Sequence, residues 1–202
     1  MTPVTCPNFA TTEGISIYTS ATINGIFFTE LNDTKVTFGA MLGKLQTHFR
    51  GIDGKFYNVI KSKSDNGQEK DEVVTNLQQD EIEVFEQQWA ENWKSIVNLP
   101  PKSVLRTVGK SRRTSTETED ETYYSEYTES FVKTGPIEVS QKSRQRIIEE
   151  QSYKVIEWTE HGRDYVTVET NVDVGESKKI FEQLWAKNWK RSINRGRKCC
   201  YG

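Results

Sequence analysis

The chain has 202 residues, and 27 Lys plus Arg against 29 Asp plus Glu leave a net charge of −2. This balance excludes a protein that binds phosphate over its whole surface, and it equally excludes an acidic solvating tail. Apolar residues make up 34% of the chain, Ile and Val outnumber Leu and Ala, and no apolar run approaches the about 20 residues of a membrane span. Residues 1–10 also lack the basic and apolar regions of a signal peptide, so we expect an intracellular, cytoplasmic, β-rich protein.

The first half of the chain is predicted to form strands. Turn-forming dipeptides and glycines separate the apolar runs at Asn24-Gly25, at Asn32-Asp33, at 51–54 and at Asn66-Gly67. The expected strands are 15–23, 26–31, 36–45, 56–62 and 73–77.

An amphipathic helix follows these strands. Its apolar residues recur at helical spacing: Ile82, Phe85, Trp89, Trp93 and Ile96. Asp80 can cap its start. Such a stripe is typical of a core face that covers a sheet; the alternative is a tryptophan-lined ligand slot.

The second half repeats the first at an offset of 96 residues. Residues 85–98 and 181–194 are identical at nine of fourteen positions, and the second stripe comprises Phe181, Leu184, Trp185, Trp189 and Ile193. The runs 153–159 and 165–170 predict a hairpin that matches the one in the first half. A repeat of this length indicates a tandem duplication.

We therefore predict an α+β fold in which an antiparallel multistranded β-sheet unit, closed by a C-terminal amphipathic helix, occurs twice. The two units are expected to pack as a pseudo-twofold pair with one shared core. The predicted segments are an N-terminal extension (1–8), repeat 1 (9–98), a Pro-containing linker (99–104), repeat 2 (105–194) and a basic tail (195–202).

Charge is distributed unevenly between the halves. Basic residues without an intervening acid occur in two blocks, one in 102–113 and one in 187–198. Such a block is often only a solvated face, but near exposed aromatic rings it can follow the phosphates of single-stranded nucleic acid. The candidate nucleic-acid-binding residues are Lys102, Arg106, Lys110, Arg112, Arg113, Lys187, Lys190, Arg191, Arg195, Arg197 and Lys198.

Two aromatic pairs, Phe27-Phe28 and Tyr123-Tyr124, could supply stacking rings. Adjacent residues of a strand point to opposite faces, so one ring of each pair is expected to be buried. We assign Phe28 and Tyr124 as the candidate stacking rings.

The three cysteines, Cys6, Cys199 and Cys200, lie near the ends of the chain and predict no disulfide framework. The last two follow basic residues, so lipidation there would bring membrane contact, although a disordered basic tail is the favoured interpretation.

No catalytic motif singles out an active site. The two histidines, His48 near a predicted strand end and His161 at a predicted turn, are not at equivalent positions of the repeat. No phosphate loop, nucleophile elbow or metal-spaced Cys/His set occurs. We expect no catalytic residues, no metal, no cofactor and no enzymatic activity.

The segment 54–59, the following hairpin and the helix beginning at Asp80 give a layout that resembles the Whirly and PUR-repeat proteins. The resemblance covers both repeats in outline and implies binding of single-stranded nucleic acid on the sheets. Two other classes stay open: an assembly or scaffold protein that contacts protein partners or forms homo-oligomers, and a carrier of an apolar ligand.

Overall fold

The computed structural model describes residues 9–39, 43–64, 66–118 and 120–201, with side chains described up to residue 194 except that of residue 192. Five strands and a helix occur twice along the chain. The first set is β1 (Ala10–Ile23), β2 (Ile26–Gly39), β3 (Gly43–Ile52), β4 (Lys55–Ser64), β5 (Glu69–Thr75) and α1 (Ile82–Val97). The second set is β6 (Leu105–Glu117), β7 (Tyr123–Thr134), β8 (Val139–Ile148), β9 (Gln151–Glu160), β10 (Arg163–Thr170) and α2 (Glu176–Tyr201). Short 3₁₀ turns, Gln79–Glu81 and Pro101–Ser103, precede α1 and β6.

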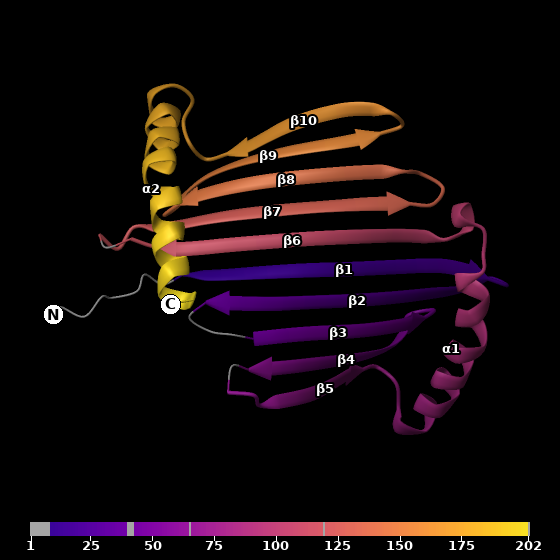
Figure 1. The fold of residues 1–202 in the computed structure, drawn as a ribbon. Helices are drawn as coiled ribbons and strands as arrows, with labels where there is room; N and C mark the ends of the chain where they lie inside the picture. The colour runs from indigo at the N-terminus through magenta and orange to yellow at the C-terminus, as the bar shows by residue number, and fades with distance from the viewer. Residues whose placement is uncertain (1–8, 40–42, 65, 119, 202) are drawn as a thin grey trace.

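All ten strands form one antiparallel sheet, in the order β10-β9-β8-β7-β6-β1-β2-β3-β4-β5 (Figure 1). The predicted α+β class with an antiparallel sheet is confirmed. The strands of the two halves nevertheless share a single sheet, because β1 pairs with β6 at its centre, from Ala10↔Ser115 to Ser20↔Leu105. β5 and β10 are the edge strands.

Both helices pack on the same face of this sheet, at opposite ends of the strands (Figure 1). Residues that pair directly across antiparallel strands point to one face, and alternate residues of a strand share a face. Ala21 of β1 belongs to the cluster under α1, and Thr11 points to the same face of this strand. Thr11 pairs with Thr114 of β6, which shares its face with Thr116. Thr116 in turn pairs with Tyr124, which lies under α2, so both helices cover one face. We call this side the helix-bearing face and the opposite side the open face.

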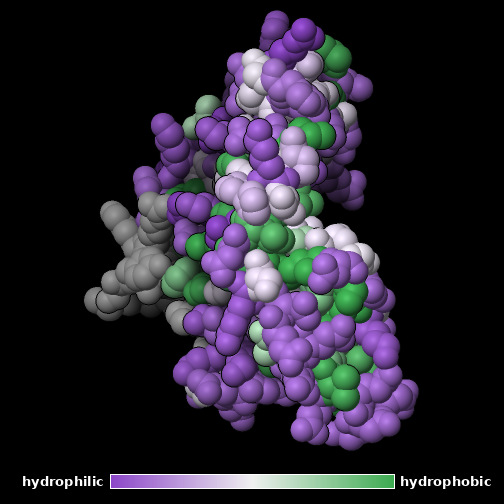
Figure 2. All heavy atoms as spheres, turned by 90° about the vertical axis from the view of Figure 1, so that its right-hand side faces the viewer, coloured by the Kyte–Doolittle hydropathy of each residue, from purple (hydrophilic) through white to green (hydrophobic). Residues whose placement is uncertain are grey.

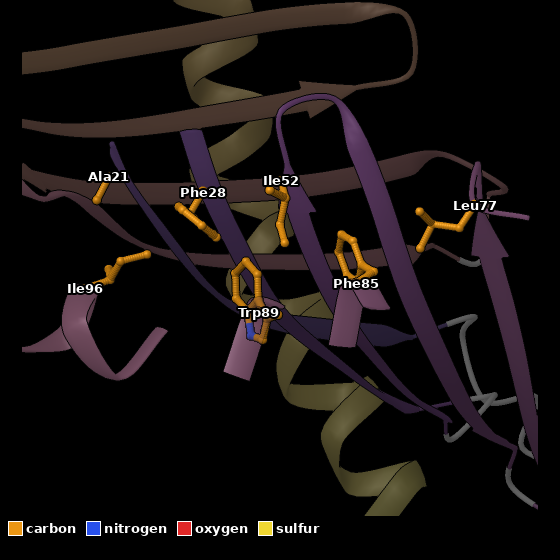
Figure 3. Close-up of a cluster of buried hydrophobic side chains, with 7 residues drawn as sticks. All are labelled: Ala21, Phe28, Ile52, Leu77, Phe85, Trp89 and Ile96. Atoms are coloured by element: carbon orange, nitrogen blue, oxygen red, sulfur yellow. The ribbon is translucent and has the colours of Figure 1, made fainter. Parts of the chain in front are cut away.

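Each helix covers its own hydrophobic cluster, so the expectation of one shared core is wrong. Figure 3 shows the first cluster, in which side chains of α1 and of the sheet point toward one another: Ala21, Phe28, Ile52, Leu77, Phe85, Trp89 and Ile96. The second cluster lies under α2 and comprises Tyr124, Ile148, Val172, Phe181, Trp185 and Trp189. The helices lie at opposite ends of strands about 14 residues long, which separates the two clusters.

The tryptophans on the helices fill these clusters, as the core interpretation predicts. Trp89 stacks on Trp93 at 4.6 Å between ring centroids, and Trp185 stacks on Trp189 at 4.5 Å. Phe28 and Tyr124 face these rings from the sheet, at 6.1 Å from Trp89 and 6.3 Å from Trp185.

Several predicted boundaries are wrong, among them the starts of β1, at Ala10 rather than residue 15, and of β5, at Glu69 rather than residue 73. β2 continues through Asn32-Asp33, because a strand paired on both sides accommodates these polar residues without a turn. The predicted strand 36–45 is interrupted at Gly39, whose φ of 123° and close approach to the Phe9 carbonyl exclude a side chain. At the other end of the chain α2 continues to Tyr201, so the segment expected as a disordered tail is helical up to that residue.

The surface seen from the α1 end is mainly hydrophilic, with hydrophobic side chains in small separate patches (Figure 2). Within the described part of the chain, no helix has the length and apolar character needed to cross a membrane.

Candidate polyanion-binding face

The basic residues of β6 lie mostly on the helix-bearing face. Arg106, Lys110 and Arg112 occupy even-numbered positions, like Thr114 and Thr116, and all three are exposed. Arg113 points to the open face, where its guanidinium donates to Ser125 Oγ at 3.3 Å and to the Tyr123 hydroxyl at 3.3 Å.

A second row of cations lies two strands away, on β8. Lys142, Arg144 and Arg146 occupy alternate positions and share a face with Ile148, which belongs to the cluster under α2. The candidate residues chosen from the sequence did not include these three. Their spacing of two residues in a strand-forming segment is the signal that could have identified them.

The strand register sets the two rows side by side. Lys110 pairs with Ser130 of β7, which pairs with Lys142; Arg112 pairs with Thr128, which pairs with Arg144. Each pair of cations is thus separated by one hydroxyl-bearing residue and by two strand spacings, about 10 Å.

Two of these cations are neutralised in part by carboxylates. Arg144 contacts Glu126 at 2.7 Å, and Arg112 lies 3.5 Å from Glu13. Lys110, Lys142 and Arg146 form no ion pair within the residues that the structure describes. Glu126 and Glu157 lie opposite Arg146 and Lys142 in the strand register, so the second half of this face presents an excess of positive charge that is only partly offset.

Cations on the first half of the helix-bearing face are mostly paired. The ion pairs are Arg50–Glu86, Lys55–Glu81, Lys61–Asp71 and Lys63–Glu69. The hydrogen bond from Lys63 holds the pKa of Glu69 below its usual range, and the hydrogen bond from Lys55 does the same for the pKa of Glu81. Both carboxylates are thus charged at neutral pH and offset their lysines.

A groove of about 390 Å³ opens on β8 and β9 beside the β8 cations. Its walls carry Lys142, Arg144, Arg146, Tyr153, Val155 and Glu157, with Ser143 also in contact. Three cations against one carboxylate make the groove positive, while Tyr153 and Val155 add an apolar part to its lining.

Arg146 has an unusual environment within this groove. Its guanidinium lies over the Trp185 ring, 5.5 Å from the centroid, and its Nε, like that of Arg50, is buried without a hydrogen-bond acceptor. Arg50, 96 residues earlier, donates to both oxygens of Glu86 at 2.6 and 2.5 Å. The two arginines therefore differ in whether a carboxylate occupies the guanidinium.

Phe28 and Tyr124 cannot act as stacking rings. They are 0% and 2% exposed, because the helices cover the face to which they point. The expected split of each aromatic pair is confirmed, but the assignment of the exposed member is wrong: Phe27 is 45% exposed and Tyr123 is half-buried.

Other aromatic rings gather on the open face rather than beside the cations. Phe49 stacks on Phe56 at 5.5 Å, and Trp158 stacks on Tyr165 at 5.2 Å, in strands at the two sides of the sheet. Burial, and then the charge of Glu129, raise the pKa of Tyr127 on the same face. The sheet therefore separates most exposed rings from most unpaired cations.

The remaining candidate residues are spread over both ends of the sheet. Lys102 is exposed in the 3₁₀ turn before β6, and Lys187, Lys190 and Arg191 are exposed on α2, which contacts β6. The side chains of Arg195, Arg197, Lys198, Cys199 and Cys200 lie outside the described residues, as does Cys6. The basic blocks approach each other only where β6 passes under α2 (Figure 1).

The histidines occupy different environments. His48 lies within β3 rather than near its end and contacts Glu30 at 2.9 Å, whereas His161 lies in the predicted turn between β9 and β10. Comparison with protein-family models, with curated proteins and with solved structures found no match.

Proposed function

We propose that this chain is a non-enzymatic binding module for single-stranded nucleic acid, and that the phosphate backbone lies on the second half of the helix-bearing face. The observation that carries the proposal is the set of cations left without carboxylates: Lys110, Lys142 and Arg146. Lys and Arg that are not compensated locally release counterions from a polyanion, and this release drives binding.

The proposal includes a tandem duplication arranged as a pseudo-twofold pair around β1 and β6. Turn contacts that repeat at the sequence offset support it. Asp53 accepts from the Phe27 amide at 2.8 Å, and Glu149 accepts from the Tyr123 amide. Gly39 and Gly135 both have positive φ, of 123° and 144°.

The junctions between the last strand and the helix support the duplication as well. Thr75 donates to the Phe56 carbonyl at 2.6 Å and accepts from the Leu77 amide. Thr170 donates to the Ser152 carbonyl at 2.8 Å and accepts from the Val172 amide. Two copies of one side-chain pattern, about 95 residues apart, are most simply explained by one ancestral unit.

The separation of cations from exposed rings limits how the nucleic acid is recognised. Rings of the open face cannot stack on the bases of a strand whose phosphates lie on the opposite side of the same sheet. We therefore expect recognition through the backbone, with strong salt dependence and little preference for sequence.

The test is the fluorescence anisotropy of a short unstructured oligonucleotide over a range of salt concentrations. The double variant Lys110→Gln/Lys142→Gln should weaken binding and reduce the slope of log K against log salt by about 1.4, at about 0.7 per phosphate contact. Lys35→Gln/Lys133→Gln removes the same charge from the open face and should leave the slope nearly unchanged. Equal losses in both variants, or no binding by the wild-type chain at low salt, would overturn the proposal.

A second candidate function, assembly with further copies or protein partners, is favoured by the β10 edge. Both edge strands expose valines, Val73 and Val74 on β5 and Val166 and Val168 on β10, but β5 begins with four charged residues, 69–72, which disfavour edge pairing, and β10 with only two. Sedimentation velocity of the nucleic-acid-free chain tests this candidate. Concentration-dependent size that Val166→Lys abolishes and Val73→Lys in β5 leaves unchanged would favour assembly.

A further inference from the structure

We propose that the groove on β8 and β9 is a binding site for the phosphate of a nucleotide-sized phosphate ester, with Arg146 as its principal ligand. The inference deepens the proposed function, on which it rests for the nature of the polymer, by naming a discrete phosphate subsite. A single nucleotide is too small to span both cationic rows, so the subsite can be tested separately.

The guanidinium of Arg146 lacks, among the described residues, the carboxylate partner that Arg50 has. Arginine binds phosphate through a planar fork of N–H donors, which a carboxylate such as Glu86 fills in the case of Arg50. Arg146 packs one side of its guanidinium against Trp185 and donates to no acceptor in the described structure. Its orientation is thus fixed by an aromatic ring while its terminal donors are left for a ligand.

Arg146 has no ion pair within the described part of the chain, although a carboxylate stands at the position that corresponds to Glu86. Glu182 occupies the position 96 residues after Glu86, but its oxygen lies 4.0 Å from Lys178 Nζ, one turn earlier in α2. The residue 96 positions before Lys178 is Ile82, which cannot compete for Glu86. Lys178 thus competes with Arg146 for this carboxylate, through an exposed contact that is longer than a hydrogen bond.

The groove contains further cations beside Arg146. Lys142, which is exposed and unpaired, and Arg144, which is shared with Glu126, stand on the same face at intervals of two residues from Arg146. Lys178 Nζ lies 5.0 Å from the centroid of the Tyr153 ring, so this lysine also borders the lining. A phosphate at Arg146 would therefore meet further cations of β8.

The groove has the size of a small-ligand site. A volume of about 390 Å³ falls at the lower end of the range for small-ligand sites. It accommodates one phosphate together with a sugar and a base, for which Tyr153 and Val155 provide apolar contact. Inorganic phosphate alone would leave this part of the groove unused, so a nucleotide should bind more tightly than free phosphate.

Isothermal titration calorimetry of the full chain tests the site with three probes: a nucleoside 5′-monophosphate, inorganic phosphate and the nucleoside. We expect the monophosphate to bind most tightly, phosphate more weakly and the nucleoside undetectably. Arg146→Gln should lower the affinity for the monophosphate about tenfold or more, whereas Arg50→Gln, the matched variant in the first half, should leave it unchanged.

Two further variants keep the result decisive. If Arg146→Gln fails to fold, Lys142→Gln replaces an exposed side chain and should still lower the affinity for the monophosphate several-fold. Lys110→Gln, outside the groove, should affect only the oligonucleotide. The subsite is overturned if the monophosphate does not bind the wild-type chain, or if it binds Arg146→Gln and Lys142→Gln as tightly as the wild-type chain. Either result holds even if oligonucleotide binding persists. Monophosphate binding without oligonucleotide binding would overturn the proposed function alone.

Discussion

Arg50 and Arg146 occupy the same place in the two halves of the chain and have different partners. Arg50 lies over Tyr57 at 5.7 Å and is held by Glu86, whereas Arg146 lies over Trp185 and has no carboxylate. Near Arg146, it is Lys178 that contacts the tyrosine ring and the glutamate at the positions corresponding to the partners of Arg50. These residues are Tyr153 and Glu182. One lysine on the helix thus converts a structural ion pair into an open anion site.

The same difference extends over the helix-bearing face. Most cations on the first half of this face form ion pairs with carboxylates of neighbouring strands and of the turn before α1. The chain up to residue 101 is also acidic overall. In the second half, unpaired cations alternate with hydroxyl-bearing residues. Net charge alone, −2 for the chain, conceals this division.

The largest effect is expected from removing the buried tryptophans of the helices. These substitutions test whether the stability of the two ends of the sheet depends equally on their helices. Trp89→Ala and Trp185→Ala each remove a buried ring, both 5% exposed, and should each cost about 3–5 kcal/mol of unfolding free energy. Urea unfolding measures both. A much smaller loss in one variant would show that its helix is not a core element; Trp158→Ala, on the open face, serves as a partly buried control.

A smaller loss of stability is expected where the two arginines differ. Arg50→Gln breaks a bidentate ion pair and should destabilise the chain by on the order of 1–2 kcal/mol, discounted because Glu86 is partly exposed. Arg146→Gln loses mainly its contact with Trp185, about 0.5–1 kcal/mol. The same urea titration compares them, and a larger loss for Arg146→Gln would contradict its assignment as a ligand-binding rather than structural residue.

Local features of this fold could be predicted from the sequence, and distant pairings could not. The helical stripes and the turns at Asn24-Gly25 and His161-Gly162 depend on neighbours along the chain, and the structure contains them. The pairing of β1 with β6 joins residues about 100 apart, for which no local pattern exists. The continuous sheet and the separate cores follow from that pairing.

The candidate site shows the same limit. Alternation predicts that one residue of each aromatic pair is buried, but only the position of the helices decides that it is Phe28 and Tyr124. The sequence shows the alternating cations of β6 and β8. That the two rows lie side by side follows only from the pairing of both strands with β7. Predicting that Arg146 has no ion pair with Glu182 requires the direction of the Glu182 side chain, which the sequence does not give.

Removing the Glu86 carboxylate should create in the first half an arginine without an ion pair, as the second half already has among its described residues. Glu86→Gln leaves Arg50 without its anion, so the variant should bind an oligonucleotide more tightly, by about two- to fivefold at low salt. Fluorescence anisotropy measures the gain, and Glu83→Gln, an exposed substitution on the same helix, controls for the change in net charge. Equal gains in both variants would mean that total charge, not the release of Arg50, governs binding.

The smallest effect is expected from exchanging the residue that distinguishes the two halves. Lys178→Ile gives α2 the residue that α1 has at the corresponding position, and Glu182 loses its partner 4.0 Å away. The glutamate is then free to pair with Arg146 as Glu86 pairs with Arg50, which should lower affinity for a nucleoside monophosphate by about two- to fivefold. The double variant Lys178→Ile/Glu182→Gln separates this route from the simple loss of a lysine: because residue 182 then carries no carboxylate that could occupy Arg146, affinity should recover. If the double variant binds as weakly as Lys178→Ile alone, Lys178 acts as a direct ligand and does not keep Arg146 free by holding Glu182.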